Sequence, residues 1–258
     1  MRVGFIGFGT IARGLQALIQ DRAAEQVAIV GAIVRDGAKV RPAGSPKVLS
    51  SVRELLGEQP EVVVECGGHD ALQSFGPDVL RGGCDLIMVS VGAFARPGLF
   101  EEIVEAARQG CSQARVASGA IGALDAIASG AVGGLTRVTH TTRKPPRSLY
   151  SPEEADRITE VQEVFRGPAR EAALRFPENV NVCAAVSLAG IGLDRTEMRI
   201  VADPSVQRNQ HEVAAEGEFG RLRFEIENVP TEKPATGRIV AMSVFKELLN
   251  RHAPFVIG

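Results

Sequence analysis

The sequence predicts an α/β protein with a doubly wound parallel sheet in its first half and a second, α+β domain after it. Three observations carry this prediction. Up to about residue 122, near-continuous apolar runs alternate with helical patterns, as in sheets that are covered on both faces. A glycine turn joins the first apolar run to the first helix. In the later part, runs such as TRVTHTTRKPP and RLRFEIENVP alternate polar and apolar side chains, which is typical of strands with one face on a core.

The elements of the first half follow in order. Strands are expected at Val3–Ile6 and within QVAIVGAIVRDG, PEVVVECGG and CDLIMVSVGAF. The helix after the first strand has apolar residues on one face, namely Ile11, Leu15, Leu18 and Ile19. A further helix is expected in PGLFEEIVEAARQG, because Pro97 stands near its start and Gly110 at its end.

The second half is expected to contain a hairpin turn at EGEFGR, a loop or surface helix at SPEEADRITE, and a last helix in GRIVAMSVFKELLNRH. Four apolar residues are expected on one face of that last helix, Ile239, Met242, Phe245 and Leu249. We therefore divide the chain into a first domain over 1–122, a second domain over 123–236, and a C-terminal helix over 237–258 that returns to the first domain.

Composition limits the classes of function. The 258 residues are 45% hydrophobic and 23% charged, with a net charge of -2, as expected for a globular protein with a core. This charge balance, with no tryptophan and one tyrosine, argues against a nucleic-acid partner. No apolar run could span a bilayer and no signal peptide is evident, so neither a membrane partner nor export is expected. The four cysteines lack C-x-x-C spacing, which predicts no metal site and favours a reducing cytoplasm.

The glycine turn is a G-x-G-x-x-A motif, from Gly7 to Ala12, between a strand and a helix. Gly7 permits a tight turn, Gly9 lets the backbone approach a pyrophosphate, and Ala12 allows close packing of the helix on the strand. Thr10 and Ile11 open the helix, whose N-terminus favours an anion. The turn predicts a Rossmann-type domain that binds a dinucleotide, with a purely structural turn as the alternative.

Two further segments are candidates for cofactor contacts. The second strand ends in VRDG, where Arg35 suits a 2′-phosphate and Asp36 suits a ribose 2′-hydroxyl. Both chemistries stand side by side, so we expect NAD and NADP to be accepted; two solvated loop charges are the alternative. The next strand ends in ECGGH, which places Cys66 and Gly67 at the switch-point crevice. His69 in this segment contacts the cofactor or caps the following helix.

A bound nicotinamide implies hydride transfer, which needs a substrate anchor and a proton acceptor. The adjacent cations Arg143 and Lys144 suit a substrate with carboxylates, or they form the solvated edge of a strand. His211 shares its strand parity with Val213 and Ala215, so its imidazole is expected to point inward. From these residues alone it is either a satisfied core histidine or the proton acceptor.

The chain resembles the L-aspartate dehydrogenase family over essentially its whole length. The matching segments are GFGTIA, VVVECGGHDAL, VSVGAF, SGAIGALDAI, TTRKPP, FPENVNVCAAVSLAGIGLDRT, ADPSVQRNQHEV and GEFGRLRFEIENVP. The resemblance implies a Rossmann-type domain and an α/β catalytic domain, similar in architecture to dihydrodipicolinate reductase. It also implies oxidation of L-aspartate to iminoaspartate with NAD or NADP, or the reverse reaction. The imine hydrolyses to oxaloacetate and ammonia, or it feeds NAD biosynthesis.

The resemblance also implies roles for single residues. The catalytic histidine of the family's N-x-H motif falls on His211, with Asn209 beside it as a candidate for substrate binding. Cofactor contacts of the family fall on Ala120 in GAIGA and on Asn181 in NVN. The segment CGGH replaces a CAGH that is common in relatives, which leaves the assignment intact.

Two alternatives stand beside this function: another NAD(P)-dependent oxidoreductase of the dihydrodipicolinate reductase type, and a non-catalytic dinucleotide sensor. The K-x-D-x-P-S-G-T segment usual in that reductase is missing, and His211, Arg143 and Lys144 argue against a sensor. The one-sided strands of the second domain predict a homodimer or a larger even homo-oligomer.

Overall fold

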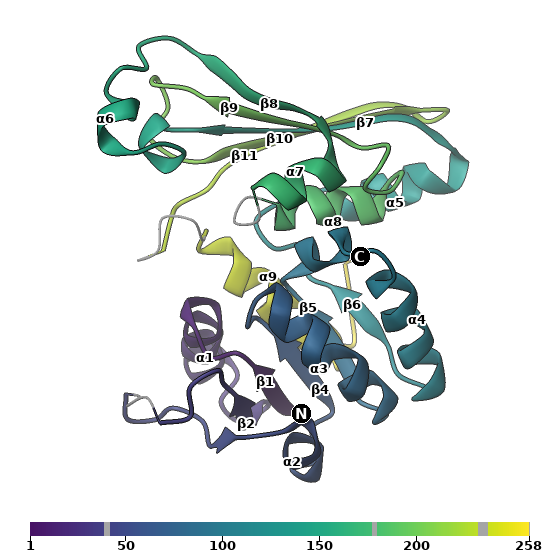
Figure 1. The fold of residues 1–258 in the computed structure, drawn as a ribbon. Coiled ribbons are helices and arrows are strands. Elements are labelled where there is room, and N and C mark those ends of the chain that lie inside the picture. Colours follow the sequence, from purple (N-terminus) through teal and green to yellow (C-terminus); the bar gives the residue numbers. More distant parts are fainter. Residues whose placement is uncertain (39–41, 177–179, 232–236, 258) are drawn as a thin grey trace. The chain divides into compact units, whose positions relative to one another are not determined.

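A computed structural model describes residues 1–38, 42–176, 180–231 and 237–257 of the chain. Within these residues the chain forms two compact units (Figure 1). The first unit combines Met1–Ala117 with Val240–Ile257, and the second covers Ser118–Ile239.

The first unit is built on a parallel sheet. Among the described residues its strand order is β3-β2-β1-β4-β5-β6, and every neighbouring pair is parallel. The strands are β1 Arg2–Ile6, β2 Ala28–Ile33, β3 Val48–Leu49, β4 Val62–Glu65, β5 Asp85–Met88 and β6 Ala114–Val116. The order reverses direction between β1 and β4, which makes this the switch point of a doubly wound dinucleotide-binding sheet. The predicted fold class of the first half is confirmed.

Helices connect these strands: α1 Thr10–Arg22, α2 Val52–Gly57, α3 His69–Arg81, the 3-10 helix η1 Val91–Ala95 and α4 Leu99–Gln109. The helix expected in PGLFEEIVEAARQG is α4, which follows Gly98 in the left-handed region and stops before Gly110. Its buried residues are Leu99, Ile103 and Ala106. Their spacing follows the helical period, so this prediction is confirmed.

The last helix, α9 Ile239–Asn250, approaches α1 closely at two small residues. A Cβ at Gly14 of α1 would lie 3.2 Å from the Cβ of Ala241, so the two helix backbones approach closely there. The buried side of α9 contains Val240, Ala241, Ser243, Val244, Phe245 and Leu248. The predicted apolar face is wrong at Met242 and Leu249, which are 51% and 37% exposed. The contact at Gly14 turns the small residue of α9 inward, and these larger side chains face outward.

The second unit is built on a mixed sheet with the order β11-β10-β7-β9-β8 among the described residues. Its strands are β7 Leu135–Lys144, β8 Gln162–Pro168, β9 Glu197–Ala202, β10 Gln210–Gly217 and β11 Gly220–Glu227. β7 and β9 are parallel, whereas the other neighbouring strands are antiparallel. β10 and β11 form the predicted hairpin, in which Gly217 pairs with Gly220, whose φ is 110°.

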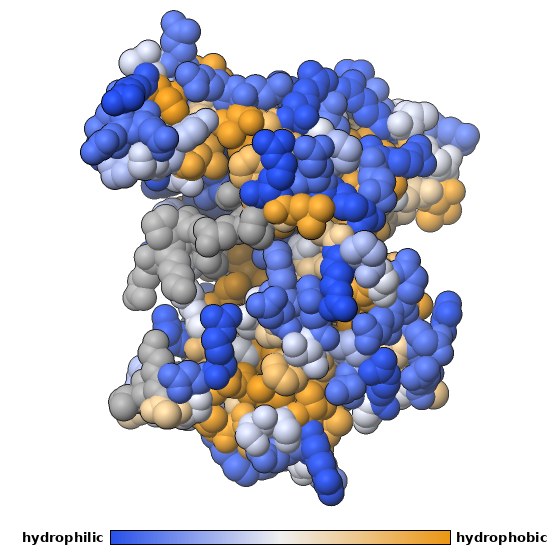
Figure 2. All heavy atoms as spheres, viewed as in Figure 1, coloured by the Kyte–Doolittle hydropathy of each residue, from blue (hydrophilic) through white to orange (hydrophobic). Residues whose placement is uncertain are grey.

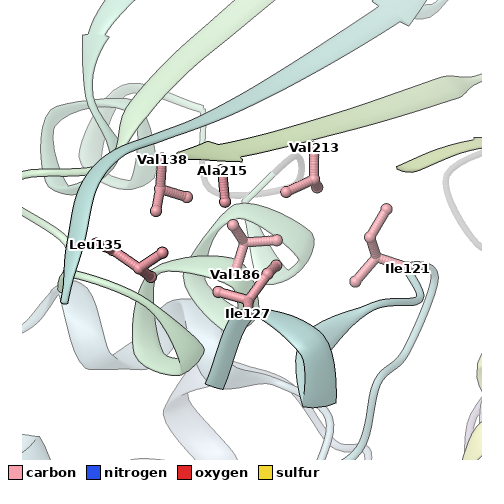
Figure 3. Close-up of a cluster of buried hydrophobic side chains, with 7 residues drawn as sticks. All are labelled: Ile121, Ile127, Leu135, Val138, Val186, Val213 and Ala215. Atoms are coloured by element: carbon pink, nitrogen blue, oxygen red, sulfur yellow. The ribbon is translucent and has the colours of Figure 1, made fainter. Parts of the chain in front are cut away.

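Helices cover one face of this sheet, which we call its inner face. α5 Leu124–Gly133 and α8 Asn181–Ala189 pack on each other and against strands β10 and β7, and α7 Ala169–Arg175 packs on α8 (Figure 1). The core of the unit contains Ile121, Ile127, Leu135, Val138, Val186, Val213 and Ala215 (Figure 3). Figure 3 shows the strand residues pointing toward Ile127 of α5 and Val186 of α8. The inner face of β7 and β10 is therefore fixed by apolar packing.

The polar segment SPEEADRITE contains a short helix, α6 Pro152–Ala155, after the 3-10 helix η2 Pro146–Ser148. Ser151 and Glu154 form a capping box, in which each side chain receives a backbone N–H of the other residue. The prediction of a loop or a surface helix is confirmed as a helix of 4 residues.

The outer face of the sheet carries rows of charges. Arg223 lies 2.9 Å from Glu212, and Arg199 lies 2.7 Å from Glu163. Partly exposed pairs of this kind contribute only about 0–1 kcal/mol each. In Figure 2 the atoms along the upper rim of this sheet are mainly hydrophilic. The apolar inner face, not the ion pairs, therefore holds the sheet in place.

Within the described residues no helix is long and apolar enough to cross a membrane. The same part of the chain brings together no group of three His, Cys, Asp or Glu side chains that could hold a metal ion. All four cysteines are placed by the structure, and all are free thiols.

Candidate active site

One candidate site lies in the first unit, where β1 and β4 end. Gly7 has a φ of 85°, and a Cβ at that position would lie 2.3 Å from the Cα of Gly67. The thiol of Cys66 donates to the carbonyl oxygen of Gly7 over 3.5 Å. The turn after β1 and the turn after β4 thus pack backbone against backbone. This contact brings three predicted cofactor residues together and leaves no room for a side chain at Gly7.

The N-terminus of α1 follows directly and is open. Gly9 is the N-cap residue, and nothing lies within 4 Å of the position its Cβ would take. The hydroxyl oxygen of Thr10 is buried and has no hydrogen-bond partner among the described residues. Gly9 offers no side-chain cap, so the first amides of the helix are donors for an anion. Together with Ile11 in the same turn, these residues fit the pyrophosphate of a dinucleotide.

Arg35 and Asp36 follow β2, the strand beside β1, and both are exposed. Oδ1 of Asp36 accepts a hydrogen bond from the backbone N–H of Ala38 over 3.0 Å. This bond turns one carboxylate oxygen back into its own loop, as in an Asx turn. The end of the second strand is where dinucleotide-binding sheets hold the adenosine ribose. Both residues lie at the end of this strand, and their contact with a cofactor stays a prediction.

A buried carboxylate, which sequence analysis missed, holds the turn after β4. Oε1 of Glu65 accepts hydrogen bonds from the backbone N–H groups of Gly67 and Gly68, at 2.8 and 3.0 Å. It also accepts from the Ser90 hydroxyl at 2.8 Å, and Oε2 accepts from the Ser90 backbone N–H at 3.0 Å. Burial raises the pKa of Glu65, and these donors lower it. The available signal in the sequence is a charge at the end of the apolar run VVVE.

A separate candidate site lies in the second unit, on the inner face of β10. His211, Val213 and Ala215 are all buried there, so the predicted inward direction of His211 is confirmed. Nδ1 of His211 lies 3.2 Å from Nε2 of His140, and the two rings are nearly parallel, with planes 19° apart and centroids 5.4 Å apart. Burial lowers the pKa of His211 to about 4, and the positive charge of Lys144 lowers it as well. The imidazole of His211 is therefore neutral near pH 7.

His140 is the second residue that sequence analysis missed. It lies on β7, is fully buried, and pairs across the ladder with Val213, while His211 pairs with Thr142. The two histidines are therefore diagonal neighbours on one face of adjacent strands. Burial, then His211 and Lys144, lowers the pKa of His140 well below its ordinary value. The alternation in TRVTHTTRK indicates that His140 faces inward, but its partner depends on strand register, which the sequence does not display.

Lys144 and Arg143 lie on opposite faces of the sheet. They are consecutive residues of β7, and successive side chains of a strand point to opposite sides. Lys144 is buried on the inner face with His211. Arg143 lies on the outer face, where Nη1 is 3.5 Å from Oδ2 of Asp203. The structure thus does not bring the predicted cationic pair together, because the pleat of β7 separates its two members.

Asn228, which sequence analysis missed, forms hydrogen bonds with two predicted site residues, Asn209 and Ala120. Its backbone N–H donates to the carbonyl oxygen of Asn209 at 3.0 Å. Its side-chain Nδ2 donates to the carbonyl oxygen of Ala120, also at 3.0 Å. Asn181 is the first residue of α8, the helix that packs against the inner face. Ala120 and Asn209 are therefore linked within the second unit through one buried residue, which bonds Asn209 by its backbone and Ala120 by its side chain.

The other two histidines lie in the first unit. His69 is the first residue of α3, directly after Gly68. Nε2 of His252 lies 3.2 Å from Oε2 of Glu61, in a pair that is exposed on both sides. His252 thus has a surface contact and serves below as a matched control for the buried histidines.

Comparisons with known proteins point to one family. The family model described as "Homoserine dehydrogenase, NAD binding domain" matches residues 7–117, and that described as "Aspartate dehydrogenase, C-terminal" matches residues 125–251. The L-aspartate dehydrogenase of Cupriavidus necator is 38% identical to this chain over 97% of each protein. The crystal structure of aspartate dehydrogenase from Thermotoga maritima has a TM-score of 0.83 at 26% identity, and covers 100% of this chain and 99% of that chain. Dihydrodipicolinate reductase from Paenisporosarcina shares the fold, with a TM-score of 0.57, 12% identity, and coverage of 97% and 94%.

Proposed function

The chain belongs to the L-aspartate dehydrogenase family, and we propose that it oxidises L-aspartate to iminoaspartate with NAD or NADP, with His211 as the proton acceptor. The imine then hydrolyses to oxaloacetate and ammonia. The observation that carries the proposal is a neutral, buried imidazole beside a buried ammonium on one face of the second unit. The imidazole can take a proton from the amino group of a substrate, and the ammonium can bind a carboxylate, so the pair suits an amino acid with two carboxylates.

The cofactor is assigned to the open glycine turn and its neighbours. Gly7 and Gly9 let the backbone approach the pyrophosphate, and the N-terminus of α1, with Thr10 and Ile11, faces its charge. The further candidates are Arg35 and Asp36 for the ribose side, and Cys66, Gly67, Ala120 and Asn181 for other contacts. When bound, the nicotinamide supplies the acceptor for the hydride that leaves the α-carbon of the substrate.

The proton must leave the substrate amine before the hydride leaves the α-carbon. A neutral amine can use its lone pair to form the C=N bond as the C–H bond breaks, whereas an ammonium has no such pair. Nδ1 of His211 is engaged with His140, so Nε2 is the atom that takes the proton. A substrate carboxylate beside Lys144 offsets the positive charge that lowers the pKa of His211. Binding of aspartate therefore makes His211 a stronger base.

The role of His211 is tested by His211→Ala. We expect kcat to fall by about 10²–10⁴-fold, the usual contribution of positioned proton transfer, while the cofactor is still bound. In the wild type, kcat should rise with pH through one ionisation that lies above the value of about 4 for the free imidazole. The variant should lose this dependence. The measurement is the pH–rate profile of both proteins, corrected for the folded fraction by melting curves.

The matched control for this test is His252→Ala, which removes an exposed histidine and should leave the profile unchanged. A His211→Ala protein with normal turnover per folded molecule would return His211 to the role of a core residue. That result would remove the proton acceptor from the proposed function.

Substrate anchoring is assigned to Lys144, with Asn209 beside the start of β10 as a further candidate. We expect Lys144→Met to raise KM for L-aspartate by about 10–100-fold, the equivalent of one charge-assisted hydrogen bond. The variant should also shift the ionisation of His211 upward, because a neighbouring positive charge is gone. Arg143→Met is the matched control, since Arg143 lies on the outer face with Asp203. Equal losses in the two variants would contradict the assignment.

Cofactor choice is assigned to Arg35, for which a 2′-phosphate is the natural partner. We expect both NAD and NADP to support turnover. Arg35→Ala should raise KM for NADP more than for NAD, with a loss of about 1.5–3 kcal/mol for one charge-assisted contact. Steady-state kinetics with each cofactor measures this ratio. An unchanged ratio in the variant would exclude Arg35 from the cofactor site.

We further propose that the enzyme works in the cytoplasm as a homodimer or a larger even homo-oligomer. Four free thiols fit a reducing compartment. The outer face of the second unit's sheet carries charges of both signs, such as Arg223 and Glu212, which suit pairing with a second copy. Light scattering at micromolar concentration should give an even multiple of 27.4 kDa. A monomeric mass would contradict the assembly.

A further inference from the structure

The contact between His140 and His211 raises the question of which nitrogen of His211 carries its proton. A neutral imidazole has one N–H and one lone pair, and only the nitrogen with the lone pair can take a proton. Nδ1 of His211 and Nε2 of His140 share one contact of 3.2 Å, so one of these two nitrogens donates and the other accepts. The choice made in this contact decides whether Nε2 of His211 is a base or a donor.

We propose that His140 is a positioning residue, whose Nε2 accepts the Nδ1–H of His211 and thereby keeps the lone pair of His211 on Nε2. This inference rests on the proposed role of His211 as proton acceptor. It assigns to His140 no contact with substrate or cofactor. In this arrangement a proton gained at Nε2 leaves a cationic ring that still donates through Nδ1, so His140 also stabilises the charged form.

The surroundings of His140 suit an acceptor that does not compete for the proton. Burial lowers its pKa first, and the charges of His211 and Lys144 lower it as well. Across the ladders, its direct neighbours are Val213 of β10 and Met198 of β9, which are both apolar. The titratable groups that act on it are therefore His211 and Lys144, and each opposes a second positive charge. His140 stays neutral while His211 changes its charge.

No donor among the described residues faces the far nitrogen of His140, so nothing there forces the ring proton of His140 onto Nε2. Nδ1 of His140 is buried and has no hydrogen-bond partner in the part of the chain that the structure describes. In the proposed tautomer this nitrogen carries the proton of His140 without an acceptor, which is unfavourable, so the bond from His211 to Nε2 alone has to hold the tautomer. The ring planes are only 19° apart and the two rings meet edge to edge, so the contact lies close to both ring planes, as a hydrogen bond between the rings requires. A lone pair on Nε2 of His211 requires the proton of that ring on Nδ1, and the contact then places the proton of His140 on its own Nδ1.

Substitution of His140 tests the inference by kinetics. His140→Met fills a similar volume without an acceptor, and kcat should fall by about 10–100-fold while KM for the cofactor stays unchanged. His140→Gln can place its amide oxygen near the former Nε2 and should recover most of that loss. Val138→Ala is the matched control, because Val138 is a buried residue of the same face that pairs across the ladder with Ala215 and not with His211. It should lower the melting temperature and keep the turnover per folded molecule.

Nitrogen NMR of the histidine rings provides a readout that does not depend on activity. Near pH 7 the wild type should show His211 protonated at Nδ1, with the signals assigned from the His211→Ala and His140→Met proteins. His140→Met should lose this fixed tautomer, and His140→Gln should keep it. A wild-type His211 protonated at Nε2, or normal kcat in folded His140→Met, would overturn the inference.

The two proposals fail separately in this design. Normal turnover in His211→Ala would remove the proposed proton acceptor, whatever tautomer the NMR spectra report. A large loss in His211→Ala together with no loss in His140→Met would retain the base and remove its positioning residue. A loss in His140→Met without rescue by glutamine would indicate a packing role and would also overturn the inference.

Discussion

The pleat of β7 is the constraint on which the second unit depends. Successive side chains of this strand alternate between two environments, so Val138, His140 and Lys144 reach the inner face and Arg143 does not. The same alternation on β10 carries His211 inward. A shift of one residue in either strand would exchange the inner and outer sets completely. The apolar core therefore also matters for the chemistry, because the packing of Val213 and Ala215 fixes the register of β10 that brings the two histidines together.

The fold accommodates the two buried histidines, His140 and His211, by keeping both of them uncharged. A buried imidazolium beside Lys144 would suffer both desolvation and repulsion, so both histidines are neutral at pH 7. Burial of a polar atom without a partner still costs about 1–3 kcal/mol. Nδ1 of His140 and Oγ1 of Thr142 are such atoms among the described residues. The unpartnered atoms near His211 thus lower the stability of the folded unit, and the apolar packing farther along the strands offsets this loss. Such a distribution is typical of functional sites.

Sequence reasoning succeeded wherever the signal was local or periodic. The parallel sheet, helix α4, the hairpin at Gly217 and Gly220, and the inward direction of His211 all follow from such patterns. It failed at α9, where the buried side depends on a close approach between Gly14 and Ala241. The hydrophobic pattern of that helix is compatible with more than one rotation, and only the partner helix selects among them. It also grouped Arg143 with Lys144, although strand alternation already separates neighbours in a sequence.

The residues that sequence analysis missed share one physical property, which is that their partners lie far away in the chain. Glu65 binds the backbone at Ser90, His140 meets His211, and Asn228 reaches Ala120. Each is a polar side chain whose buried bonds hold another residue in position. The residues that were found are recognisable from their immediate neighbours, as Gly7 is from its turn. A single sequence therefore identifies the groups that contact ligands more readily than the groups that orient them, since orientation is a property of register and packing.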